Sequence, residues 1–453
     1  MTGQPALRRE LGTWAVAVAG VAMIVASTTL VSEFSGWLTL GLGFAFALLI
    51  AFVANLFLGL SVAELSTRFP RAGALYAFAR EGLPGPRGAR LGMFLALLFY
   101  STMIVAATGE IAGGAHGLNS LLGGALDLRV CIVILLAAAV LPNLIGLASV
   151  AWINAILLLG MLGIRWWVGI AAFMGWTEPG TWEASHIATE LAPRDFLTRG
   201  LGLAVWTFVG IEFVAPLAEE VKRPRWAMPR GIVIALLVVL ATTLVMGIGT
   251  AGVLSPDAWS AIAFGPAGCG GDCAQLAVGQ TLFGPAGQTL MAIASVTATY
   301  GSASVGLAAT SRVLYSVARD LRQGRVASSL ASLNRFSVPW VALLVTGVLL
   351  AIPALWSTLV VDWIFTAAYA WMLVFAVYHV LLIVIRRRQP ASAAVFQAPR
   401  WLPWAGLALV LLSLYYSYIE LGHLKYGGRA VVLILLVALV SLLFRPALYA
   451  RTR

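Results

Sequence analysis

A carboxylate in the middle of an apolar stretch constrains this chain more than any other feature. Residues 205–213 read Val-Trp-Thr-Phe-Val-Gly-Ile-Glu-Phe, and they lie inside a run of bilayer length. A charged side chain at the bilayer centre costs about 3 kcal/mol on insertion scales, so Glu212 is expected to face protein or water. Glu212 is therefore a candidate functional residue. The alternative is a continuous helix that carries Glu212 to a paired position at its cytoplasmic end.

Two positions predict broken membrane helices. Gly210 lies near the centre of its apolar run, beside Trp206 and Val209, and such a glycine suits a helix whose freed backbone groups line a cavity. The first apolar run becomes small and polar at Ala26-Ser27-Thr28, which predicts a second break. The alternative there is an intact helix in which the hydroxyl groups bond back to earlier carbonyls.

The composition is that of an integral membrane protein without a soluble domain, because 61% of the 453 residues are hydrophobic and 10% are charged. Apolar runs of bilayer length predict twelve spans. These spans lie near residues 13–36, 38–64, 90–116, 128–146, 150–175, 198–218, 230–252, 284–312, 338–356, 360–385, 402–420 and 428–446.

The net charge of +11 does not indicate a nucleic-acid partner, because the basic residues lie in short loops between the apolar spans. Placing the N-terminus in the cytoplasm puts most of the 29 Lys and Arg on that side, which predicts two cytoplasmic termini. We expect a multi-pass protein of the cell (inner) membrane that contacts the lipid bilayer and is a monomer or a homodimer. The arginine clusters are interpreted as topology determinants rather than specific lipid sites.

A weak internal repeat predicts the domain organisation. An offset of 190 residues aligns Leu11-Gly12 with Leu201-Gly202 and Gly20 with Gly210. It relates a first repeat (residues 1–175, spans one to five) to a second (198–385, spans six to ten), and leaves residues 386–453 as two peripheral spans. Because five is odd, the second repeat is inverted, an arrangement typical of secondary transporters that bind substrate near the midplane.

Three further residues are candidates for substrate contact. Glu110 in the third span can bind a substrate ammonium or carry a proton, or it can be a packing acid bonded to a neighbouring span. Trp206 directly precedes the predicted break and can close over a cationic substrate. Ser302 in the eighth span can line the pocket, although close helix packing explains a small residue there equally well.

Other charged residues are expected to be peripheral. Glu33 and Asp362 lie nearer to the ends of their spans and are expected to be solvated. Arg165 lies inside the fifth span and can supply a cation, but Trp166 and Trp167 beside it favour an interfacial anchor.

The cysteines and histidines do not predict an enzyme or a bound cofactor. Cys269 and Cys273 share an outer loop that allows a local disulfide, and Cys131 is expected in the core. No His is expected near that loop, so a metal site is not predicted there. The four histidines form no metal or catalytic-triad pattern, so no catalytic residue and no cofactor is predicted.

Three separated motifs resemble the amino acid-polyamine-organocation transporter superfamily. Residues 61–76 (SVAELSTRFPRAGALY) resemble its segment between spans two and three, residues 206–230 its sixth span and exit loop, and residues 310–320 (TSRVLYSVARD) the end of its eighth span. The resemblance implies the leucine-transporter fold, with a five-plus-five inverted repeat, discontinuous helices 1 and 6, two peripheral helices and alternating access.

The resemblance also implies roles for individual residues. The sixth span is similar to that of the arginine-agmatine antiporter, which implies that Trp206 covers the substrate and that Glu212 takes part in pH-dependent coupling, with protons as one candidate coupling ion. Ala107 falls on the substrate side of the third span. Two departures matter. Ile24-Val25-Ala26, or Ala26-Ser27-Thr28 in a shifted alignment, replaces a glycine-rich run that receives substrate carboxylates, so recognition of an amino-acid carboxylate is not assured. Met161 stands where proton-coupled members carry a lysine, so their coupling mechanism is not assumed.

The sequence therefore predicts a secondary transporter of an amino acid or related amine, with a preference for cationic or amine-bearing molecules. The coupling ion and the direction of transport stay open. A sensor or channel built on the same fold is the alternative, and a membrane-embedded enzyme is a more distant one.

Overall fold

The structure is a computed structural model that describes residues 7–188, 193–321, 324–390, 395–420 and 426–443. Within these ranges every regular element is a helix, apart from one isolated β-bridge between Leu11 and Val221, which confirms the predicted all-α class. The elements are α1 (Thr13–Ile24), α2 (Ser27–Leu40), α3 (Leu42–Arg68), α4 (Leu75–Gly82), α5 (Gly85–Leu121), α6 (Leu128–Asn143), α7 (Leu147–Phe173), α8 (Ala184–Ile187), α9 (Pro193–Trp206), η1 (Ile211–Glu220), α10 (Pro224–Ala251), α11 (Pro256–Ala263), η2 (Pro266–Gly271), α12 (Ala274–Leu321), α13 (Gly324–Leu330), α14 (Trp340–Trp356), α15 (Val360–Arg388), α16 (Leu402–Glu420) and α17 (Tyr426–Leu443).

Many of these helices are long and apolar enough to cross a bilayer. Among the described residues there are seven such spans, formed by α3, α5, α7, α9 with η1, α10, α12 and α15, and the bent pair α1 and α2 makes an eighth. Four further apolar helices, α6, α14, α16 and α17, are shorter. The chain is therefore a multi-pass membrane protein. The count of twelve spans and the five-plus-five repeat stay predictions.

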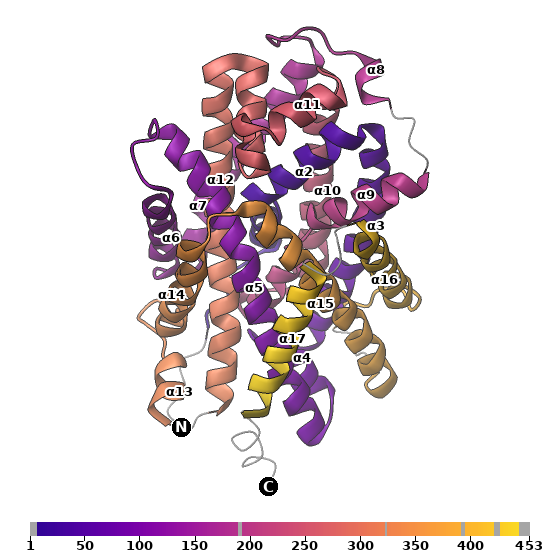
Figure 1. Ribbon diagram of the computed structural model, residues 1–453. Helices are drawn as coiled ribbons and strands as arrows, with labels where there is room; N and C mark the ends of the chain where they lie inside the picture. The colour runs from indigo at the N-terminus through magenta and orange to yellow at the C-terminus, as the bar shows by residue number, and fades with distance from the viewer. Residues whose placement is uncertain (1–6, 189–192, 322–323, 391–394, 421–425, 444–453) are drawn as a thin grey trace.

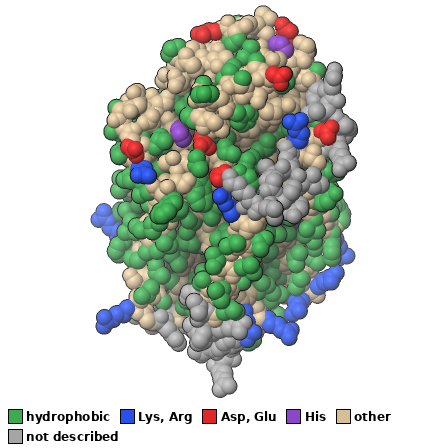
Figure 2. All heavy atoms as spheres, viewed as in Figure 1, with side chains coloured by type: hydrophobic (Ala, Val, Ile, Leu, Met, Phe, Trp, Pro, Cys, Tyr) green, Lys and Arg blue, Asp and Glu red, His purple; other side chains and the backbone are tan. Residues whose placement is uncertain are grey.

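The surface fits a lipid environment. Figure 1 shows long helices that run side by side, with α4 and α13 at one end of the molecule and α8 and α11 at the other. On the face shown in Figure 2, hydrophobic side chains cover the middle, and Asp and Glu appear only toward the α8 and α11 end. An apolar belt between polar ends is the pattern that a bilayer selects.

The first predicted break is present. Helix α1 ends at Ile24 and α2 begins at Ser27, with Val25 and Ala26 between them outside helical geometry, and the two helix axes differ by 61°. The Val25 amide still donates to the Val21 carbonyl (2.8 Å), which closes the last turn of α1. No side chain caps the first amides of α2, so this helix start presents backbone donors to its surroundings.

The second break is also present and lies against the first. Helix α9 ends at Trp206, and η1 begins at Ile211 after a turn that contains Gly210. Gly210 has φ +128°, a conformation that L-residues with side chains rarely adopt, and a β-carbon there would lie 3.0 Å from Met23 Cγ and 3.1 Å from Ile24 N. Glycine therefore permits both the turn and the close approach of the two interrupted helices.

The element after the second break is unusual. Ten consecutive residues, Ile211–Glu220, form a 3-10 helix that contains Pro216. Such helices rarely exceed three or four residues, and longer stretches often mark a hinge. This region therefore differs from an ordinary membrane helix on both sides of Gly210.

Candidate functional site

Glu212 occupies the start of η1 and is fully buried. Its Oε2 accepts a hydrogen bond from the Gly210 amide (3.1 Å), and its Oε1 has no partner. The buried Tyr378 hydroxyl on α15 also lacks a partner, and it lies near enough to Glu212 to feel the charge of the carboxyl. One oxygen of Glu212 therefore fixes the turn at the break, and the other is available to a ligand or a proton.

Glu110 lies beside Glu212 on a different helix. It is buried in α5, and its carboxyl lies within electrostatic range of the Ser302 hydroxyl of α12 and of the Glu212 carboxyl, while the Ser302 hydroxyl itself donates to the Thr299 carbonyl (3.2 Å). Its Oε2 has no hydrogen-bond partner. The Thr299 hydroxyl donates to the Glu110 carbonyl (3.0 Å) and fixes α12 against α5 at this level. The structure thus brings together three predicted residues, Glu110, Ser302 and Glu212.

The start of α2 contributes hydroxyl groups from the first break. The Ser27 and Ser295 hydroxyls are 2.6 Å apart, and Ser295 also bonds the Gly113 carbonyl (3.2 Å) and the Gln275 amide nitrogen (3.2 Å). Thr28 follows Ser27 and has a buried hydroxyl without a partner. Sequence reasoning selected Ser27 and Thr28 but missed Ser295 and Gln275, since only the folded chain brings α12 to the break.

Five unpartnered buried polar atoms lie on the interrupted helices or on helices packed in the same bundle. These atoms are Thr28 Oγ1, Glu110 Oε2, Glu212 Oε1, Gln275 Oε1 and the Tyr378 hydroxyl. They belong to helices that contact one another, and leaving a buried polar group unsatisfied costs about 1–3 kcal/mol. Convergent polar groups in an apolar setting are typical of a small-molecule site.

The remaining predicted site residues lie at the two breaks or on α5. No hydrogen bond from their side chains to Glu110 or Glu212 is described. Trp206 ends α9 with 2% of its surface exposed, and Val209 lies in the following turn. Ala26 precedes α2, and Ala107 is fully buried in α5 one turn before Glu110. The predicted position of Trp206 directly before the break is confirmed, whereas its contact with a substrate stays a prediction.

The predicted solvation of Glu33 and the favoured interfacial role of Arg165 are wrong, and the alternative, in which Arg165 supplies a cation, is confirmed. Both side chains are buried, and Arg165 Nη2 forms an ion pair with Glu33 Oε2. Thr243 Oγ1 donates to Glu33 Oε1 (2.5 Å), and Arg165 Nε lies 3.3 Å from Met246 Sδ. The bend between α1 and α2 directs Glu33 into the bundle. Arg165 faces inward although Trp166, the next residue on α7, is 40% exposed.

Asp362 behaves as expected for a residue near a span end. Its side chain is 25% exposed, and it pairs with Arg429 (3.2 Å) and accepts a hydrogen bond from the Tyr426 hydroxyl (2.9 Å). These contacts join the start of α15 to the start of α17.

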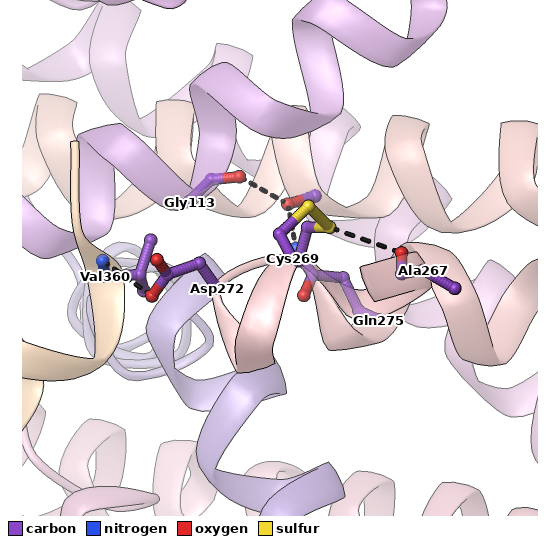
Figure 3. The surroundings of a disulfide bond; sticks show 8 residues. Gly113, Ala267, Cys269, Asp272, Gln275 and Val360 are labelled. Atoms are coloured by element: carbon purple, nitrogen blue, oxygen red, sulfur yellow. Dashed lines mark hydrogen bonds between the residues drawn. A yellow bond between two sulfur atoms is a disulfide. The ribbon is translucent and has the colours of Figure 1, made fainter. Parts of the chain in front are cut away.

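The segment between α11 and α12 contains the disulfide that the sequence allowed, between Cys269 and Cys273 (Figure 3). Asp272, between them, accepts hydrogen bonds from the Val360 and Val361 amides (2.9 Å each) and so caps α15. The expectation that no His lies near is wrong, because a His116 ring nitrogen lies within 4.8 Å of both sulfurs. Sulfurs bonded to each other are not thiolate ligands, so the group as folded does not match a metal site.

At the end of the molecule away from the disulfide, hydrogen bonds link the segment before α1 to the end of η1. We call this set of contacts the closure. The Leu11 amide donates to the Glu220 carbonyl (3.0 Å), and the Lys222 amide donates to the Leu11 carbonyl (2.9 Å). Arg312, fully buried near the end of α12, forms an ion pair with the Glu220 carboxylate. The segment before α1 is therefore joined to the end of η1 and to α12.

The segment after α3 also belongs to the closure, because it bonds a residue of η1. Glu219 Oε2 accepts a hydrogen bond from the Ala72 amide (2.8 Å), and its carboxylate pairs with Arg319 (2.8 Å). Ala72, Glu219 and Arg319 come from the three motifs that carry the family resemblance. Sequence reasoning found the motifs but not that they contact one another.

Comparison with known proteins agrees with this geometry. Residues 11–443 match the amino acid permease family. The branched-chain amino acid permease BcaP of Bacillus subtilis (strain 168) is 26% identical over 90% of this chain and 88% of its own length. The serine/threonine exchanger SteT of the same organism is 22% identical over 66% of this chain and 65% of its own length. The inner membrane transport protein YbaT of Escherichia coli (strain K12) is 26% identical over 55% and 54% of the two chains.

Proposed function

Because the chain belongs to the amino acid permease family, we propose that it is a secondary transporter that moves an amino acid or a related amine by alternating access. One observation carries the proposal: two interrupted helices meet at Gly210, and the unpaired carboxyls of Glu110 and Glu212 lie beside this meeting point. Substrate sites of secondary transporters lie between broken helices near the midplane.

The two carboxyls favour a substrate that carries an ammonium group. No ion pair with Lys or Arg is described for Glu110 or Glu212, unlike Glu33, so a substrate cation can compensate their charge. A second positive group, or a proton on one carboxyl, balances the remaining charge. This arrangement supports the preference for cationic or amine-bearing substrates, with Ser302 and Gln275 as further hydrogen-bonding groups.

A substrate carboxylate has a place at the start of α2. The Ser27 and Thr28 amides open this helix without a side-chain cap, and the N-terminus of a helix favours negative charge. These amides can therefore still receive a substrate carboxylate without the glycines, although the side chains that replace the glycines leave the carboxylate less room to reach them. In this arrangement Trp206 covers the substrate from the α9 side.

Transport requires the closure at the α4 and α13 end to open. The Leu11 pairing with Glu220 and Lys222, and the Glu219–Arg319 pair, hold the moving helices together on that side. We place this side in the cytoplasm, with both termini, within a twelve-span five-plus-five repeat. Release of the substrate then follows separation of these contacts.

Reconstitution into liposomes tests the proposed function. We expect saturable counterflow with at least one member of a panel of L-isoleucine, L-serine, L-arginine, agmatine and putrescine, with the amine-rich members preferred. Flux that does not saturate with any of these compounds supports a channel, and binding without flux supports a sensor. Either result contradicts the carrier. Carrier activity confined to isoleucine and serine contradicts only the cationic preference.

A further inference from the structure

An arginine-lined pocket lies at the end of the molecule opposite the disulfide loop. Its volume is about 460 Å³, within the usual range for small-molecule sites. It lies between the end of α3, the end of α15 and the start of α16. Its walls are formed by Arg68, Ile383, Arg386, Arg387, Pro390, Gln397, Ala398, Arg400, Pro403 and Trp404.

One wall of the pocket is fixed by a buried carboxylate. Glu64 is fully buried and accepts hydrogen bonds from Arg68 Nη2 (2.7 Å), Arg386 Nε (2.9 Å) and the Ala398 amide (2.9 Å). Arg68 Nε and Arg386 Nη2 also donate to the Glu64 carboxylate, whereas Nη1 of each arginine bonds a backbone carbonyl, that of Gln389 for Arg68 (3.0 Å) and that of Pro399 for Arg386 (3.2 Å). This wall is therefore preformed, and Glu64 is already shared between two guanidinium groups.

The other wall offers two exposed guanidinium groups. No hydrogen bond or ion pair to a carboxylate is described for Arg387 or Arg400 in the ranges that the structure covers. The Arg387 guanidinium lies over the Trp404 ring, 5.6 Å from its centre. Four arginines against one carboxylate leave the pocket strongly positive, which suits an anion with several acceptor oxygens.

The apolar part of the pocket indicates the source of the anion. Ile383, Pro403 and the half-exposed ring of Trp404 line the same pocket as the arginines. Tryptophan at a polar end of a membrane protein lies at the headgroup level of the bilayer. A free phosphate ion contacts only the arginines of the pocket, whereas a phospholipid contacts the arginines with its phosphate and the apolar side chains with the rest of the molecule.

From this geometry we propose that the pocket binds the phosphate of an anionic phospholipid headgroup, with Arg387 and Arg400 as its direct ligands. The site does not depend on the transport mechanism. The pocket does adjoin the closure. Arg68 lies four residues before Ala72, and the Ala72 amide bonds Glu219. An occupied pocket therefore stabilises the segment that helps to hold that end shut.

Native mass spectrometry of the purified full-length chain in neutral detergent tests this site. Phosphatidylglycerol is titrated against wild type, the double variant Arg387→Gln/Arg400→Gln and a matched double variant, Arg325→Gln/Arg335→Gln, which removes two exposed arginines elsewhere, one in α13 and one in the turn before α14. Each basic residue near an anionic lipid contributes about 1 kcal/mol. We expect the site variant to bind about thirtyfold more weakly, equivalent to about 2 kcal/mol, and the matched variant to bind as wild type does.

Three further arms make the outcome decisive. Phosphatidylcholine and inorganic phosphate are each expected to bind wild type at least tenfold more weakly than phosphatidylglycerol. Equal binding of phosphate indicates a free-ion site and overturns the lipid assignment, as does equal binding of phosphatidylcholine. Equal losses in the site and matched variants indicate general charge attraction and overturn the pocket. If the Gln variant does not fold, Arg387→Lys/Arg400→Lys replaces it, and unchanged affinity there contradicts bidentate recognition by arginine.

Discussion

The protein buries carboxyls in two kinds of surroundings. Glu33 belongs to the first kind, and Glu110 and Glu212 belong to the second. Glu33 has an arginine partner on α7 and a threonine donor on α10. Glu110 lies within electrostatic range of Ser302 and Glu212, Glu212 accepts a hydrogen bond from a backbone amide, and each carboxyl keeps an oxygen without a partner. All three carboxyls are buried, and they differ in whether a cation pairs with them. The paired carboxyl, Glu33, is structural, whereas the two unpaired ones are candidates for binding a ligand or a proton.

The contrast has an energetic consequence. Removing one member of a buried ion pair leaves an uncompensated charge, which typically costs about 3–5 kcal/mol. Neutralising a carboxyl that has no cationic partner removes a charge whose burial was itself unfavourable. The two regions should therefore respond in opposite ways to loss of charge.

The largest expected effect follows removal of Arg165. Arg165→Met leaves the Glu33 carboxylate buried without its cation, so we expect the free energy of unfolding to fall by about 3–5 kcal/mol in a denaturant titration of detergent-purified protein. The double variant Glu33→Gln/Arg165→Met removes both charges and should recover most of this loss. Arg129→Met, at an exposed position, is the matched control. Wild-type stability of Arg165→Met would show that the pair is not structural.

An intermediate effect is expected for Glu110→Gln. This change keeps the shape of the side chain and removes a charge-assisted contact with a substrate ammonium, worth about 1.5–3 kcal/mol. The KM for counterflow of the preferred amine should rise about 10- to 100-fold, with stability near that of wild type. Asp362→Asn, which neutralises a partly exposed acid at a span end, should leave the KM within about twofold. An unchanged KM in Glu110→Gln removes this residue from the substrate site.

The smallest effect is expected for Thr243→Val. It deletes one hydrogen bond to the Glu33 carboxylate while Arg165 remains, so unfolding should become easier by about 1–2 kcal/mol and transport should be unchanged. Thr289→Val, whose exposed hydroxyl bonds only its own helix, provides the baseline for a threonine-to-valine change. A transport defect in Thr243→Val at normal stability would place the Glu33 pair inside the transport cycle.

Sequence reasoning succeeded where the signal is local. Gly210, Glu212 and the run at Ala26-Ser27-Thr28 lie within a few residues of the breaks they produce, so their chemistry is visible in a short window. The family resemblance rests on motifs of fixed local spacing, and the match to the amino acid permease family confirms it.

It failed where the partner lies far along the chain. Glu33 and Arg165 are 132 residues apart, and their pairing depends on the 61° bend and on the face that α7 turns inward. The tryptophans beside Arg165 belong to other faces of the same helix and therefore misled the prediction. His116 was missed near the disulfide for the same reason, since α5 and the segment that contains the disulfide meet only in the folded chain.

The pH dependence of substrate affinity in Glu212→Gln tests the central claim most directly, with counterflow KM measured on both sides of neutrality. In wild type, we expect protonation of Glu212 to weaken binding of a cationic substrate, so KM rises as the pH falls. Glu212→Gln should flatten this dependence, whereas Glu33→Gln/Arg165→Met should keep the wild-type profile. A Glu212→Gln protein that retains the full pH dependence would contradict the assignment of the unpaired carboxyl to coupling.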